Sequence, residues 1–329
     1  MKILVTGAAG MIGQKLCARL AQDSALGGRT ISSLHMVDVA APVLAAAAFP
    51  VTVEAADIAD PRLAPRLMAS RPDIIFHLAA IVSGEAELDF DRGYAINLDG
   101  ARLLLDAIRA ENLKSSGAYR PRFVFASSIA VFGAPFPDAI TDDFHLTPLT
   151  SYGTQKAIDE LLLSDYTRKG FVDGVGIRLP TICVRPGRPN AAASGFFSNI
   201  IREPLVDRTA TLPVPDTVRH THATPRAAVG FLLHAATLDG ERIGPRRNLS
   251  MPGVSVTVGE QIEALRRVAG DRAVALIERK PDALISRIVS GWPEKFTACR
   301  AIELGFVAET SFDDIIRTHI DDELGGTIP

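Results

Sequence analysis

A glycine-rich turn near the start of the chain constrains the fold more than any other feature of the sequence. Residues 2–6 form an apolar, β-branched run that predicts a strand, and three glycines follow it at intervals of three residues. Apolar residues at helical spacing then predict a helix over residues 14–22. A strand that enters a helix through glycines brings bare backbone N–H groups and the positive end of the helix dipole to one point. This turn is therefore predicted to hold a pyrophosphate group, through Gly7, Gly10, Met11, Ile12 and Gly13.

Strand-like and helix-like segments alternate through the first half of the chain. Further strands are predicted over residues 33–38, 51–54, 74–78, 122–126 and 174–178. Helices are predicted between them over residues 61–70, 97–111 and 153–169. Such alternation indicates an α/β fold with a doubly wound parallel sheet of the Rossmann type, covered by helices on both faces.

The regular alternation ends after Arg178. Residues 180–222 contain eight prolines or glycines and only short mixed runs, which suggests an excursion into a smaller lobe. We expect a dinucleotide-binding domain over residues 1–179 with a return segment of about 223–250. Residues 180–222 and 251–329 are expected to form a smaller, mixed α/β lobe that binds the substrate, with helices near 258–268 and 312–322.

Composition excludes several classes of protein. A formal net charge of −3 gives no basic footprint for nucleic acid, and the longest uncharged stretches carry prolines and are too short to span a membrane. The three cysteines lie far apart, without the spacing of a metal site or a disulfide framework. The first predicted strand begins at Lys2 and leaves no room for a signal peptide. We therefore expect a cytoplasmic protein without a bound metal.

Two acidic residues follow predicted strands where a dinucleotide would lie. Asp38 could accept hydrogen bonds from the adenosine ribose diol and would repel a 2′-phosphate, and neither Val39 nor Ala40 supplies an arginine for that phosphate. The sequence thus favours NAD over NADP. Asp57 and Ile58 could hold the adenine, although a solvated loop aspartate is the alternative.

A tyrosine and a lysine four residues apart form the candidate catalytic pair. On a helix, Tyr152 and Lys156 would project from the same face, and an ammonium beside a phenol favours the phenolate. Tyr152 could then act as a general acid or base on a hydroxyl or carbonyl. The preceding strand runs into Ser127 and Ser128, either of which could contact the substrate oxygen. A serine hydrolase is an alternative, but the chain has no Gly-x-Ser-x-Gly elbow.

Together these motifs resemble the extended short-chain dehydrogenase/reductase family. The resemblance is carried by the Gly-x-x-Gly-x-x-Gly turn, Asp57-Ile58, His77-Leu78-Ala79-Ala80, Asn97, Ser127-Ser128, Val131-Phe132-Gly133 and Tyr152 with Lys156. It implies that Ser128, Tyr152 and Lys156 are catalytic and that Phe132 stands where the family usually has tyrosine. It also implies a structural role for His77. The further cofactor contacts implied are Leu78, Ala79, Ala80, Asn97, Tyr152, Lys156 and Pro180.

The second half of the chain departs from the nucleotide-sugar enzymes of that family. Pro180-Thr181 replaces their asparagine after the sixth strand, and only Arg219 survives from their Arg-Asp-Phe/Tyr segment. Six arginines and no lysine lie between Cys183 and Arg226, which suits the bidentate recognition of a carboxylate or phosphate. Arg219 is the first candidate for such a clamp and Arg185 the second. The other predicted substrate contacts are Ser127, Ser128, Tyr152, Asn190 and Ser194.

The segments 178–190 and 219–222 are similar to a family member that handles a small sugar acid. The resemblance implies an NAD-dependent dehydrogenase that oxidises the 2-hydroxyl of a small, anionic polyhydroxy acid through a Ser/Tyr/Lys proton relay. A nucleotide-sugar epimerase or dehydratase with tightly bound NAD is the main alternative. A non-catalytic dinucleotide sensor is a third, although it would have no use for the proton relay. The family also leads us to expect a homodimer formed through the helices near 97–111 and 153–169.

Overall fold

The computed structural model describes residues 1–44, 46–187 and 194–328, and these divide into two compact units. Unit 1 comprises residues 1–131, 148–178 and 229–249, and unit 2 comprises residues 132–147, 179–228 and 250–329. Each unit is therefore built from segments that are distant in the sequence. Residues 132–147 group with unit 2, whereas the sequence reading kept them in the dinucleotide-binding domain.

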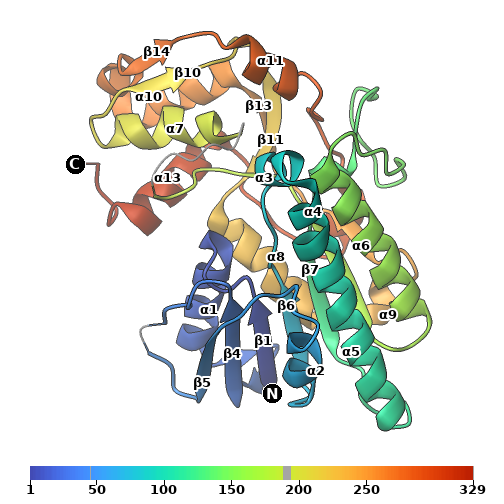
Figure 1. Cartoon of the computed structure of the whole chain (residues 1–329). Helices are drawn as coiled ribbons and strands as arrows, with labels where there is room; N and C mark the ends of the chain where they lie inside the picture. Colours follow the sequence, from blue (N-terminus) through green and yellow to red (C-terminus); the bar gives the residue numbers. More distant parts are fainter. Residues whose placement is uncertain (45, 188–193, 329) are drawn as a thin grey trace. The chain divides into compact units, whose positions relative to one another are not determined.

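Unit 1 is organised around a seven-stranded sheet of order β12-β8-β7-β6-β1-β4-β5 (Figure 1). The strands are β1 (Lys2–Thr6), β4 (Ser33–Asp38), β5 (Val51–Ala55), β6 (Ile74–His77), β7 (Arg122–Ser128), β8 (Asp173–Leu179) and β12 (Asn248–Ser250). The chain leaves β1 toward β4 and β5, then returns to build β6 and β7 on the other side of β1, and these pairs are parallel. The strand order thus reverses between β1 and β6, and open α/β sheets bind ligands at the carboxyl ends of the strands at such a point.

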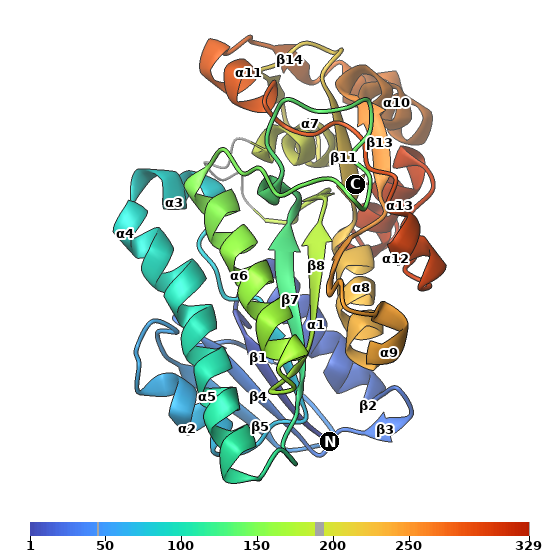
Figure 2. The ribbon, with the colours of Figure 1, turned by 90° about the vertical axis from the view of Figure 1, so that its right-hand side faces the viewer.

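Helices cover both faces of this sheet. Figure 2 shows α5 and α6 on one face and α1 on the other. The helical elements of this part are α1 (Met11–Asp23), α2 (Leu63–Met68), α3 (Ser83–Leu88), α4 (Phe90–Gly93), the π-helix η1 (Tyr94–Asp99), α5 (Gly100–Lys114), the 3₁₀ turn η2 (Ile129–Val131), α6 (Ser151–Arg168), α8 (Pro225–Thr237) and α9 (Gly240–Ile243). A short hairpin, β2 (Ala25–Leu26) with β3 (Arg29–Thr30), follows α1. Buried side chains from the strands, such as Phe123, Phe125 and Ile75, form one hydrophobic cluster with residues of α2 and α5, among them Leu67 and Leu104. The doubly wound α/β class predicted from the sequence is confirmed.

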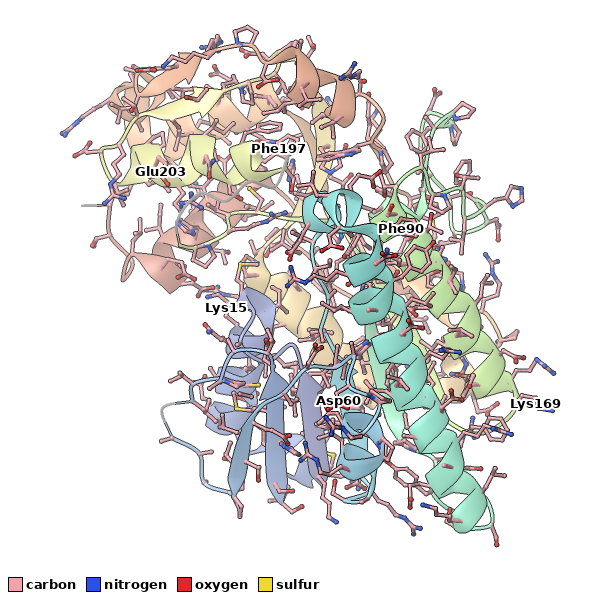
Figure 3. The ribbon with its side chains drawn as sticks, viewed as in Figure 1. Lys15, Asp60, Phe90, Lys169, Phe197 and Glu203 are labelled. Atoms are coloured by element: carbon pink, nitrogen blue, oxygen red, sulfur yellow. The ribbon has the colours of Figure 1, made fainter. Side chains whose placement is uncertain are left out.

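Unit 2 is smaller and mixed. Its three-stranded sheet has the order β13-β11-β9, and a separate pair joins β10 to β14. Its elements are β9 (Thr181–Ile182), α7 (Gly195–Leu205), β10 (Ala210–Leu212), β11 (Arg219–Ala223), β13 (Val254–Thr257), α10 (Val258–Val274), β14 (Ile277–Arg279), α11 (Ala283–Val289), α12 (Cys299–Glu303) and α13 (Phe312–Glu323). Phe197 on α7 (Figure 3) belongs to its hydrophobic core, together with residues of α10 and α13 such as Leu265 and Ile316. Among the helices of the described residues, none is long and apolar enough to cross a membrane.

Candidate active site

The glycine turn after β1 is shaped by close backbone approach. Gly7 has φ +75°, and a Cβ there would lie 2.5 Å from the backbone N of Ala79, which follows β6. A Cβ on Gly13 would lie 2.1 Å from the carbonyl oxygen of Gly7. Only glycine fits these two positions, so the turn and the first turn of α1 are pressed together at the reversal point of the sheet.

The N-terminus of α1 is open to an anion. Gly10 is the N-cap and provides no side-chain cap, the first turn carries no acidic residue, and the first helical backbone bond is donated by Gln14 N–H to Gly10 O. The N–H groups of Met11, Ile12 and Gly13 precede that bond and lie within the positive end of the helix dipole. This donor set fits a pyrophosphate.

Asp38 connects the end of β4 to the same turn. Its Oδ2 accepts a hydrogen bond from Ala9 N–H at 2.9 Å, and its Oδ1 accepts one from Ala40 N–H at 3.4 Å. The half-buried carboxylate therefore stands beside the glycine turn with lone pairs left for a ribose diol. Asp57, just beyond β5, is exposed and its Oδ1 accepts a hydrogen bond from Ala59 N–H at 2.9 Å. Ile58 is buried against Gly100 at the start of α5.

Asn97 is hydrogen-bonded within the protein interior. The residues after β6, Leu78 to Ala80, are half-buried beside the glycine turn, and Ile81 follows them. Asn97 Oδ1 accepts a hydrogen bond from Ile81 N–H at 2.8 Å, and its Nδ2 donates to Gln155 Oε1 at 2.7 Å and to Ile81 O at 3.3 Å. Asn97 is fully buried. In the structure Asn97 therefore holds the segment that follows β6, and its contact with the cofactor stays a prediction.

Tyr152 and Lys156 project from the same face of α6. Lys156 Nζ lies 5.7 Å from the centroid of the Tyr152 ring and 4.6 Å from that of Phe125 on β7, so the ammonium faces two aromatic rings. Gly153 allows α6 to pack closely on η2, because a Cβ at residue 153 would lie 2.1 Å from the carbonyl oxygen of Ala130. Burial lowers the pKa of Lys156 to about 8, while the carboxylates of Asp159 and Glu160 raise it.

The two serines at the end of β7 have different surroundings. Ser127 is buried and its Oγ donates a hydrogen bond of 2.6 Å to Glu160 Oε1. Arg178 of β8 donates to both oxygens of the same carboxylate, from Nε at 2.9 Å and from Nη2 at 2.7 Å. In the structure the Ser127 hydroxyl donates its proton to this buried network, and its contact with substrate stays a prediction. Ser128 is half-buried and its Oγ accepts a hydrogen bond from Ala130 N–H at 3.2 Å.

His77 is buried among contacts of β1 and β7, which suit the structural role that the family resemblance implied for it. Its Nδ1 shares a hydrogen bond of 2.7 Å with Thr6 Oγ1, and its ring stacks on Phe125 at 5.9 Å. Burial lowers the pKa of His77 to about 3, and the charge of Lys156 lowers it further, so this imidazole is neutral.

In unit 2, Arg219 is already paired. Its Nη2 lies 3.0 Å from Glu260 Oε2, and its Nη1 donates to Ser255 O at 2.9 Å. A substrate carboxylate would have to compete with Glu260, which weakens the prediction that Arg219 is the clamp. The sequence missed this pairing because Glu260 lies 41 residues further along the chain, on α10.

Arg185 donates hydrogen bonds to two neutral groups. Its Nε donates to Ile182 O at 3.0 Å and its Nη2 to Ser194 Oγ at 3.0 Å. The predicted contact Ser194 thus lies beside Arg185, whereas the predicted contact Asn190 lies outside the described residues. Pro180 is buried just beyond β8.

Two buried histidines, His220 and His222, follow Arg219 on β11. His220 Nε2 shares a hydrogen bond of 2.7 Å with Thr181 Oγ1, and its ring stacks on Phe197 at 5.3 Å. Burial lowers the pKa of His220 to about 4, although a backbone hydrogen bond at Pro293 raises it, and Arg185 lowers it further. His222 shares a hydrogen bond of 2.8 Å with Gln261 Nε2. Within the described ranges, no group of three or more His, Cys, Asp or Glu residues could hold a metal ion.

Comparison with known proteins identifies the family of the chain. The sequence model of the NAD dependent epimerase/dehydratase family matches residues 3–217. The chain belongs to this family. It is accordingly an NAD-dependent oxidoreductase of the extended short-chain dehydrogenase/reductase type, as the motifs predicted.

Three relatives cover almost the whole chain. A D-erythronate dehydrogenase of Cupriavidus necator is 45% identical over 98% of this chain and 98% of its own length. A D-erythronate dehydrogenase of Haemophilus influenzae is 38% identical over 98% of this chain and 99% of its own. A crystal structure from Agrobacterium tumefaciens, described as a nucleoside-diphosphate-sugar epimerase, is 64% identical with a TM-score of 0.98, and the match covers 100% of this chain and 96% of that one.

Proposed function

We propose that the protein oxidises the 2-hydroxyl of D-erythronate to 2-dehydro-D-erythronate with NAD. The observation that carries the proposal is the likeness to two proteins named D-erythronate dehydrogenase over nearly their full lengths. The pairing of Tyr152 with Lys156 supports it, because a phenol held near an ammonium is suited to take a proton from an alcohol. We place the enzyme in the cytoplasm and in carbohydrate metabolism.

The donors around the glycine turn would hold NAD. The N–H groups of Met11, Ile12 and Gly13 would bind its pyrophosphate, and Asp38 would accept from the adenosine ribose. Asp57 and Ile58 would border the adenine, while residues 78–80, Pro180 and Lys156 would border the nicotinamide ribose. When bound, NAD supplies the acceptor for the hydride that leaves C2 of the substrate.

Tyr152 and its neighbours would handle the proton. Tyr152, as the phenolate, would accept the proton of the 2-hydroxyl while the C2 hydride departs, and the nearby ammonium of Lys156 would stabilise the phenolate by charge attraction. Ser128 Oγ would donate a hydrogen bond to the substrate oxygen. Ser127, Glu160 and Arg178 would keep the end of β7 in place behind it.

Arg185 is the better candidate for the carboxylate clamp. A four-carbon acid offers few atoms, so one charged contact must supply much of the orientation. A planar guanidinium can hold a carboxylate bidentately. Arg219 already faces Glu260, whereas Arg185 lies beside the predicted substrate contact Ser194. Ser194 and Thr181 would then offer oxygens to the substrate hydroxyls.

A panel of aldonic acids, incubated with the protein and NAD while NADH absorbance is followed, tests the proposed reaction. D-Erythronate should give the highest kcat/KM, and the corresponding uncharged polyol should be a poor substrate. Arg185→Lys should raise the KM for the acid sharply, since a point charge cannot replace the guanidinium fork. Arg219→Lys is the matched control, and an equal or larger rise there would return the clamp to Arg219.

A nucleotide-sugar epimerase is the second candidate, because the relative of known structure from Agrobacterium tumefaciens carries that description. Epimerisation of a UDP-sugar without added NAD, together with no oxidation of any aldonic acid, would favour this candidate over the dehydrogenase.

A further inference from the structure

Asp159, on α6, is a buried carboxylate without a hydrogen-bonding partner. Its side chain is 2% exposed, and neither Oδ1 nor Oδ2 has a hydrogen-bond partner among the described residues. A buried carboxylate without partners is costly. An interaction with a nearby charge would offset part of this cost.

Lys156 precedes Asp159 by three residues on the same helix. Residues three apart on a helix are neighbours, about 5–6 Å apart at Cβ, and Lys156 is itself buried. The other nearby carboxylate, Glu160, is bound by Arg178 and by Ser127. Asp159 is therefore the acidic group near Lys156 that is not already neutralised by an arginine.

The elements packed against α6 supply the remaining charges. Asp99 on η1 faces Asp159 and is itself paired with Arg102 at 3.3 Å. β6 contributes the neutral His77, and β7 contributes the Phe125 ring. Glu87 of α3 accepts from Ser151 N–H at the N-terminus of α6, and Asp106 of α5 accepts from the Tyr166 hydroxyl near the other end. Both are engaged away from the middle of the helix.

We propose that Asp159 is a positioning residue that keeps the Lys156 side chain in its charged form, and thereby holds Tyr152 ready to accept a proton. The proposal rests on the catalytic role proposed for Tyr152 and Lys156. Asp159 acts only through Lys156 and does not touch the substrate.

The titration behaviour of the two groups supports this pairing. Burial raises the pKa of Asp159 to about 8, Lys156 lowers it, and Glu160 and Asp99 raise it further. Burial lowers the pKa of Lys156 to about 8, and Asp159 is the first of the two carboxylates that raise it. Each group therefore favours the charged form of the other.

The first test is the pH profile of kcat/KM, whose alkaline limb should report loss of the Lys156 proton. Asp159→Asn removes the charge at constant shape, so the alkaline limb should move about one unit toward lower pH. Asp159→Glu should retain most of the wild-type profile. Asp165→Asn, at an exposed position of the same helix, should leave the profile unchanged.

Asp99→Asn, at a half-exposed side chain, should shift the alkaline limb in the direction opposite to the shift caused by Asp159→Asn. Asp99 disfavours ionisation of Asp159, so its removal should let Asp159 ionise more readily and move the alkaline limb to higher pH. A purely structural role for Asp159 would not produce shifts in opposite directions. Profiles that superimpose on wild type, or two shifts of the same sign, would overturn the proposal.

A measurement on the enzyme without cofactor separates this proposal from the proposed function. Asp159→Asn and Lys156→Met, alone and combined, form a double-mutant cycle in urea unfolding. The coupling between them should be present at about pH 8 and lost at about pH 5, where Asp159 is protonated. A coupling that is absent, or that does not change with pH, rejects the pairing. Failure to oxidise any aldonic acid would reject the function and leave this result intact.

Discussion

Tyr152 is distinguished from two other tyrosines by the charge beside its ring. Burial and a nearby acid raise the pKa of Tyr166 to about 12, and burial with neighbouring Asp73 and Glu111 raises that of Tyr119 further. Tyr152 has the Lys156 ammonium 5.7 Å from its ring centroid instead.

Tyr152→Phe should lower kcat by roughly 10²–10⁴, the range for loss of a general acid or base, while NAD binding survives. Steady-state kinetics and a fluorescence titration with NADH measure the two effects. Tyr166→Phe removes a hydroxyl that donates to Asp106 and should leave turnover intact. Near-normal turnover of the Tyr152 variant would remove this residue from the mechanism.

Asp38 makes a second prediction at the scale of one residue. A carboxylate next to the glycine turn would repel a 2′-phosphate, so NAD should be preferred over NADP by about tenfold or more in kcat/KM. Asp38→Asn keeps an oxygen for Ala9 N–H and removes the charge, and should narrow that preference with little effect on folding. Kinetics with both cofactors decide the matter, and equal wild-type use of NAD and NADP would show that Asp38 does not face the ribose.

Local spacing predicted which residue types gather at the site, but it could not distinguish the partner of each side chain. Ser127 and Ser128 are adjacent and chemically identical, yet only Ser127 faces Glu160, which is 33 residues away in the sequence. Arg219 pairs with Glu260 for a similar reason. Such partners depend on packing between segments that are distant in the sequence. The spacing of residues within one short segment does not identify them.

At the scale of elements, α6 joins the site to the sheet. Its first turns carry Tyr152 and Lys156, and its middle carries Glu160, which is buried with Ser127 of β7 and Arg178 of β8. The charge pair therefore connects the helix to two adjacent strands.

Removing one member of this buried pair should be strongly destabilising. Glu160→Leu leaves the Arg178 guanidinium buried without its carboxylate, and the free energy of unfolding should fall by about 3–5 kcal/mol. Combining Glu160→Leu with Arg178→Met should recover part of that loss. Urea unfolding measures both, and Asp165→Asn, which removes an exposed pair with Arg168, should change little. A mild effect of Glu160→Leu would mean that the pair is not buried in solution.

The bounds of helices and strands were predicted well where the apolar residues of a segment follow a single helical or strand spacing. β1 and β4 have the bounds expected from their apolar runs, and α13 ends within one residue of the predicted helix over 312–322. The helix expected over residues 97–111 is part of a longer helical run, in which the π-helix η1 carries Asn97 and leads into α5. The hairpin of β2 and β3 and the short strands β9 and β10 were missed, since two or three residues carry no measurable periodicity.

At the scale of the whole molecule, the alternation of strands and helices in the sequence predicts only part of the assignment of segments to the two units. The sequence indicated a return segment over about residues 223–250, and residues 229–249 group with unit 1. The grouping of residues 132–147 with unit 2 was not, because they contain no strand or helix in the structure.

Assembly is the remaining prediction. α5 and α6 lie side by side on one face of the sheet (Figure 2), and Leu161 in α6 is 65% exposed while Leu163 of the same run is buried. Leu113 near the end of α5 is also exposed. Apolar side chains on neighbouring helices favour association with a second copy of the chain, as the family resemblance led us to expect.

Light scattering at micromolar concentration should therefore give the mass of a homodimer. Leu161→Lys should shift the population toward monomer, because a charge at the centre of an apolar interface is left without water or a partner. Val307→Lys is a matched control, since Val307 is an exposed aliphatic residue of unit 2, outside α5 and α6. Its mass should remain that of wild type. A wild-type monomer would exclude the dimer, and equal effects of both variants would place the interface elsewhere.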